Sequence, residues 1–148
     1  MSSGKSLPFS TTLEVRDTCL CLHVQRAARA LARRFAEALR PLGLTHGQFS
    51  LLMSLNRPEP STIGSVAALL AMDRTTLTAA VKPLERRGLL QVIVDEKDRR
   101  SRRLTLTAAG RALLVEAMPI WRRTHREVDR LLARADPETL RADLRALS

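Results

Sequence analysis

Residues 73–107 have the sequence DRTTLTAAVKPLERRGLLQVIVDEKDRRSRRLTLT, and this stretch decides the fold. Asp73 has the chemistry of a helix N-cap, because its side chain can accept from the exposed amides of the next turn. Gly88 supplies a residue that readily adopts the left-handed conformation at a helix end. The sequence therefore predicts a helix over 74–87, with three apolar residues facing the core: Leu77, Val81 and Leu84.

A β-hairpin is predicted directly after this helix. The run 89–94 is rich in β-branched residues and reads as one strand, and residues 104–106 read as the return strand. The charged segment 95–103 becomes the tip of the hairpin. Because a short helix and a tight turn closed by Met72 precede the longer helix, the order is that of a winged helix-turn-helix.

The flanking sequence predicts helices that carry apolar stripes. One helix is expected over 13–40, with apolar residues recurring every three or four positions, and others over 107–133 and after the Asp136 cap. The fold class is mainly α with a small β-hairpin, a winged helix-turn-helix between dimerisation helices. We expect four segments: a disordered tail (1–10), an N-terminal dimerisation helix (11–44), the winged-helix DNA-binding domain (45–107) and C-terminal dimerisation helices (108–148).

Composition narrows the function classes. The formal net charge of +10 predicts a polyanionic partner, either nucleic acid or an anionic membrane surface, unless the whole proteome is similarly basic. No apolar run is long enough for a membrane span and no secretory signal is recognisable, so we expect a cytoplasmic protein without membrane contact. RNA-binding modules usually expose aromatic rings for stacking, whereas this chain has three Phe, one Trp and no Tyr.

The sequence contains no recognisable catalytic motif. There is no glycine-rich phosphate loop, nucleophile elbow or Cys/His metal set. His23, His46 and His125 lack ligand spacing. We therefore expect no catalytic activity, no cofactor and no metal.

Double-stranded DNA is the partner that this fold predicts. A helix fits the major groove, where each base pair presents its own donor and acceptor pattern, and hairpin arginines can enter a narrow minor groove. The expected DNA-contacting residues are Arg74, Thr75, Thr76, Thr78 and Lys82 on the helix, and Asp98, Arg99, Arg100 and Arg102 in the hairpin.

The same stretch resembles the MarR family of bacterial regulators. The resemblance is carried by DRTTL at 73–77, LERRGL at 84–89 and DRRSRRLTLT at 98–107 with Gly110. It implies a homodimeric transcriptional regulator, expected to be a repressor, that binds a pseudo-palindromic operator and is released by a small aromatic or acyl ligand or by an oxidant. The family's wing arginine maps onto Arg100, and the aspartate that helps to orient it maps onto Asp98.

The sequence departs from the family pattern in the recognition helix. Pro83 deletes the backbone hydrogen bond to the Ala79 carbonyl, and we expect it to bend the second half of the helix away from DNA. Ala79 stands where many relatives carry a longer polar or basic residue, which predicts fewer base contacts.

The cysteines suggest an alternative function. Cys21 resembles in position the reactive cysteine of the organic-peroxide-sensing (OhrR) branch, but Gln25 and Phe35 stand where that branch has tyrosines. Because a reactive thiolate needs nearby donors or positive charge, the favoured interpretation is a packed thiol, with peroxide sensing as the alternative. Cys19, expected to be the more exposed of the pair, cannot bond to Cys21 if both lie on one helix.

Overall fold

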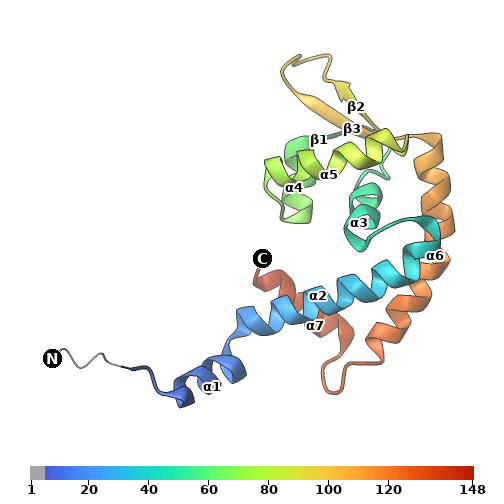
Figure 1. Cartoon of the computed structure of the whole chain (residues 1–148). Coiled ribbons are helices and arrows are strands. Elements are labelled where there is room, and N and C mark those ends of the chain that lie inside the picture. The colour runs from blue at the N-terminus through green and yellow to red at the C-terminus, as the bar shows by residue number, and fades with distance from the viewer. Residues whose placement is uncertain (1–5) are drawn as a thin grey trace.

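The computed structural model describes residues 6–148, and it is mainly helical with a small antiparallel sheet (Figure 1). The helices and strands run in the order α1 (Phe9–Thr18), α2 (Leu20–Leu39), η1 (Arg40–Leu42), α3 (His46–Ser54), β1 (Ser61–Thr62), α4 (Ile63–Leu70), α5 (Arg74–Arg86), β2 (Leu90–Val94), β3 (Arg102–Leu106), α6 (Ala108–Asp129) and α7 (Pro137–Ala146). Within the described residues, no helix is long and apolar enough to cross a membrane.

The expected single N-terminal helix is wrong, because the structure has two helices here. Cys19 has extended backbone angles and separates α1 from α2. It is the N-cap of α2, and its Sγ accepts a hydrogen bond from the Leu22 amide. The helical region also begins earlier than expected, at Phe9; of the predicted tail, residues 1–5 lie outside the described residues.

The apolar stripe of α2 divides into a covered and an uncovered part. Phe35 and Leu39 near its end are buried, at 4% and 0% exposure. Leu20 and Leu31 are 58% and 38% exposed, because α1 and the first part of α2 project away from the wing-bearing part of the chain (Figure 1). One chain alone therefore leaves an apolar helix face open to water.

Local capping chemistry sets the helices of the helix-turn-helix. Thr45 starts α3 with a capping box, in which its hydroxyl and the Gln48 side chain each accept from the other's backbone amide. Thr62 caps α4 by accepting from the Ser65 amide. Ala71 then takes a left-handed conformation, with φ of 53°, and turns the chain into α5.

The wing is part of a sheet with one more strand than the sequence predicted. The order is β1-β3-β2, with β3 antiparallel to both neighbours. Leu104 lies opposite Ser61 in β1 and Val92 in β2. β1 has only two residues, too short for alternation to reveal, and its pairing is made by β3 from a distant part of the sequence.

The recognition helix, the wing and α6 meet at one close contact. The Thr107 hydroxyl donates to the Gly88 carbonyl at 2.6 Å, and the Thr107 amide donates to the Leu89 carbonyl at 3.2 Å. Gly110, in the first turn of α6, lies so near that a Cβ added there would be 2.0 Å from the Leu89 oxygen. Only glycine fits without moving the backbone.

We expect Gly110→Ala to destabilise the protein by about 2 kcal/mol or more, because the methyl group forces two backbone segments apart. The free energy of unfolding in urea measures this loss. Gly47→Ala in α3 is the matched control: its Cβ would meet nothing closer than 4.0 Å, and alanine is the better helix former by about 1 kcal/mol. Equal stability of the two variants would contradict the close-contact argument.

Candidate nucleic-acid interface

The start of α5 is held by Asp73. Its carboxylate accepts from the Thr76 amide at 2.7 Å and from the Thr76 hydroxyl at 2.8 Å. These two hydrogen bonds, the amide one first, lower the pKa of Asp73 below its usual value. The Thr78 hydroxyl donates to the Arg74 carbonyl at 2.8 Å. With their protons used inside the helix, both hydroxyls can meet DNA only as acceptors or through their methyl groups.

The outer face of α5 is open to solvent. All the helix residues that the sequence predicted for DNA contact are exposed: Arg74, Thr75, Thr76, Thr78 and Lys82. The opposite face is buried, with Leu77 and Leu84 at 0% exposure. α5 continues through Pro83 to Arg86, so the proline interrupts a hydrogen bond without ending the helix.

A hollow of about 460 Å³ brings part of the helix set and part of the wing set together. Arg74 leans towards α4 across Gly64, where an added Cβ would come within 2.8 Å of its guanidinium. Thr75, Thr76, Lys82 and Arg99 are not among the residues that line the hollow. From the predicted set it is lined by Arg74, Thr78, Asp98, Arg100 and Arg102.

The wing tip is shaped by Asp98. Its carboxylate accepts from the Arg100 amide at 3.1 Å, and its carbonyl accepts from the Ser101 amide at 2.9 Å. Asp98 therefore contacts the backbone of Arg100, and no hydrogen bond joins it to the Arg100 guanidinium within residues 6–148. Arg102 donates to the Arg99 carbonyl at 3.0 Å, which ties it to the turn.

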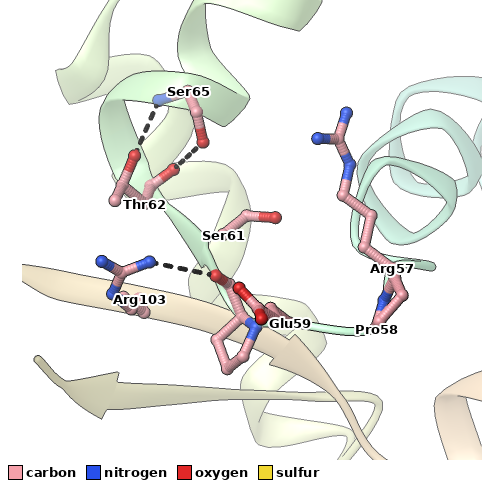
Figure 2. Close-up of a pocket in the computed structure, with 8 residues that line it drawn as sticks. Arg57, Pro58, Glu59, Ser61, Thr62, Ser65 and Arg103 are labelled. Carbon is pink, nitrogen blue, oxygen red and sulfur yellow. Dashed lines mark hydrogen bonds between the residues drawn. The ribbon is translucent and has the colours of Figure 1, made fainter.

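Arg103 is a structural residue of the wing that the sequence reasoning did not single out. Its Nε donates to Asp95 at 3.0 Å and its Nη1 donates to the Pro60 carbonyl at 3.2 Å, as Figure 2 shows for the second bond. It thus fastens β3 to the loop before β1. The Lys97 amide, followed by the Arg103 side chain, lowers the pKa of Asp95. The alternation of strand β3, which points Arg103 opposite to Arg102, was the available signal.

The cysteines are arranged opposite to the expectation. Cys21 is exposed and Cys19 is partly buried. The favoured packed-thiol interpretation of Cys21 is thus wrong for this chain. The helix break accounts for the reversal. The Cys19 Sγ accepts from the Leu22 backbone amide in the first turn of α2, while Cys21 lies within the helix and accepts from the Gln25 side chain at 3.2 Å.

Comparison with known proteins gives the same architecture. The model of the MarR family matches residues 44–101. One similar structure is the crystal structure of the Mycobacterium tuberculosis transcriptional regulator MosR in complex with DNA. Its sequence is 40% identical to this chain, and the two structures superpose with a TM-score of 0.80. The match covers 87% of this chain and 92% of the MosR chain. This chain belongs to the MarR family.

Curated relatives in the MarR comparison are also regulators by name. The transcriptional activatory protein BadR of Rhodopseudomonas palustris is 35% identical over 62% of this chain, and the match spans only 54% of BadR itself. The organic hydroperoxide resistance transcriptional regulator of Bacillus subtilis is 30% identical over 68% of this chain and 69% of its own length. The names include an activator, so family membership leaves the sign of regulation open.

We expect Asp95→Asn to lower the free energy of unfolding at pH 7, because the Arg103 guanidinium and the Lys97 amide then face a neutral group. Since the pKa of Asp95 is lowered in the folded protein, its contribution is complete above the unfolded pKa of about 3.9 and is lost as the pH falls through the folded value. The gap between wild type and variant should therefore shrink in urea titrations carried out at falling pH. Arg103→Ala should show a similar loss at pH 7, and a gap that widened in acid would contradict the assignment.

Proposed function

We propose that this chain is a DNA-binding transcriptional regulator that binds a pseudo-palindromic operator as a homodimer. One observation carries the proposal: the exposed face of α5 and the exposed wing arginine Arg100 converge on one arginine-lined hollow. Membership in the MarR family and the MosR–DNA complex support it.

The proposed mode of binding follows from the geometry of the two elements. α5 lies in the major groove, with Arg74, Thr75, Thr76, Thr78 and Lys82 towards the bases and phosphates. The wing lies over the neighbouring minor groove, where Arg100 enters and Arg99 and Arg102 meet phosphates. Asp98 serves this set by shaping the turn that presents Arg100.

The uncovered apolar faces support dimerisation. Phe9, Val15 and Leu20 near the N-terminus, and Leu144 and Leu147 in and just after α7, are large apolar residues left exposed in one chain. Burial of such area against a second copy removes it from water, at about 25 cal/mol per Å². A two-fold dimer then presents two copies of α5 to one duplex.

The mode of regulation is proposed from the family resemblance. Repression, with release by a small aromatic or acyl ligand, is the expected arrangement. Release by a ligand is proposed without an apolar pocket as support. The two hollows described in residues 6–148 are both lined in part by arginines, one at the Arg57 loop and one beside the wing.

A thiol-based response to organic peroxide is the second candidate function. The observation that favours it is the exposed Cys21 thiol, which accepts a hydrogen bond from the side-chain amide of Gln25. A neutral amide stabilises a thiolate less than a cation or a tyrosine pair would, so we keep ligand-controlled regulation as the first proposal.

We expect Arg100→Ala to weaken operator binding by about 1–3 kcal/mol, the scale of one good specific contact. Arg100→Lys should recover part of the loss, because charge returns without the planar fork of the guanidinium. Fluorescence anisotropy on operators with A·T-rich and G·C-rich flanks measures the effect, which should be larger on the A·T-rich flanks.

Arg99→Ala is the matched control for Arg100, as a neighbouring exposed arginine of the same wing tip. Its loss should be smaller and independent of the flanking sequence. Light scattering should show that every variant stays a dimer, since the wing tip lies far from the uncovered helix faces (Figure 1). Equal small losses at both positions would show that the wing supplies only diffuse charge.

We expect Cys21→Ser to leave DNA affinity unchanged, because the thiol lies on α2 and not on the DNA-facing elements. Cumene hydroperoxide should likewise leave the wild-type complex intact in a gel-shift titration, with Cys19→Ser as the matched control. Peroxide-induced release that disappears in Cys21→Ser would instead establish the peroxide-sensing candidate.

A further inference from the structure

Arg87 makes a fork of hydrogen bonds to a distant turn of the chain. It is the C-cap residue of α5. Its Nη1 donates to the Gly43 carbonyl at 2.8 Å and its Nη2 donates to the Leu42 carbonyl at 3.3 Å. Both acceptors belong to the turn that ends α2. One planar guanidinium thus joins the end of the DNA-facing helix to the end of the helix that carries the uncovered apolar stripe.

The Leu42–Gly43 turn is also held by contacts that do not involve Arg87. Two backbone amides of the turn have partners inside it, since Gly43 donates to the Arg40 carbonyl at 2.8 Å and Leu44 donates to the Leu39 carbonyl. The buried side chains of Leu39 and Leu44, at 0% and 3% exposure, anchor it on both sides. The carbonyls of Leu42 and Gly43 are therefore held in position to accept.

The fit between the turn and Arg87 is close. Gly43 has φ of 65°, and a Cβ added there would lie 3.3 Å from the Arg87 Nη2. Within residues 6–148, the two hydrogen bonds of Arg87 are the side-chain hydrogen bonds that directly join α5 and its cap to the end of α2 and the turn that follows it. Through packing, α5 contacts α4 and β2, α4 contacts α3, and α2 contacts α3 and α6.

We propose that Arg87 is a positioning residue that sets the distance between the two recognition helices of the dimer, and so the operator half-site spacing that the protein accepts. The inference rests on the proposed dimeric, DNA-binding function. α2 continues from the uncovered face to the Leu42–Gly43 turn, and α5 ends at Arg87. A bidentate bond between these two ends limits how far α5 can pivot relative to the dimer face.

The test measures affinity across a series of palindromic operators whose half-sites are moved together or apart by single base pairs, around a separation of about one helical turn. Wild type should show a sharp optimum, with about a tenfold loss for each base pair of displacement. Arg87→Ala should flatten this profile, so that the loss per displaced base pair falls to about threefold as the pivot loosens. Arg87→Lys, which cannot bond both carbonyls in one plane, should lie between them.

Arg86→Ala is the matched control, because Arg86 is the exposed neighbour with the same charge and no described hydrogen bond. It should shift affinity equally at every spacing. Thermal unfolding and light scattering confirm that each variant is a folded dimer, and Arg87→Lys preserves the test if Arg87→Ala does not fold. A profile in Arg87→Ala as sharp as in wild type and Arg86→Ala would overturn the role of Arg87, whereas a flat wild-type profile would overturn the dimeric binding mode itself.

Discussion

The close approach of Gly110 to the Leu89 carbonyl is the constraint on which the arrangement depends. Leu89 follows the C-terminal glycine of α5 and precedes β2, while Gly110 belongs to the first turn of α6. Thr107 adds hydrogen bonds to the Gly88 and Leu89 carbonyls at the same place. Three elements with different tasks therefore meet at one junction, and a shift of the recognition helix there also moves the wing and the start of α6.

The arginines of the wing and of the C-cap of α5 divide into two groups that composition cannot distinguish. Arg99 and Arg100 leave their guanidinium groups to solvent at the wing tip. Arg87 and Arg103 use theirs to bond backbone carbonyls across the fold, and Arg103 adds the Asp95 ion pair. Arginine suits both tasks, because its planar fork of donors matches phosphates and paired carbonyls alike. Net charge therefore overstates the number of arginines that are free to meet DNA.

The N-terminal region shows how a family resemblance and local structure interact. The break at Cys19 changes the surroundings of the thiols, so the apolar period of one continuous helix misassigns which one is exposed. The same projection of α1 and α2 leaves apolar side chains uncovered, which a dimer of the MarR kind would bury. In this protein the uncovered apolar side chains and the thiols lie on the same helices.

The sequence by itself determined the elements whose signals are local. Asp73 and Gly88 marked the ends of the recognition helix, and β-branched residues marked the wing strands, because caps and alternation act over a few residues. The residues that the sequence predicted to face DNA are all exposed, and five of them line one hollow. Motif spacing then identified the family.

Only the tertiary structure decided the features that depend on distant partners. The pairing of β1 with β3, the inward turn of Arg103 and the fork of Arg87 to the Leu42–Gly43 turn join residues about 40 positions apart or more. The uncovered state of Leu20 and Leu31 likewise follows from where α2 lies, and not from its apolar period. A side chain's hydrophobicity and charge are properties of the sequence, but its partner is set by which segments the fold brings within hydrogen-bond or contact distance.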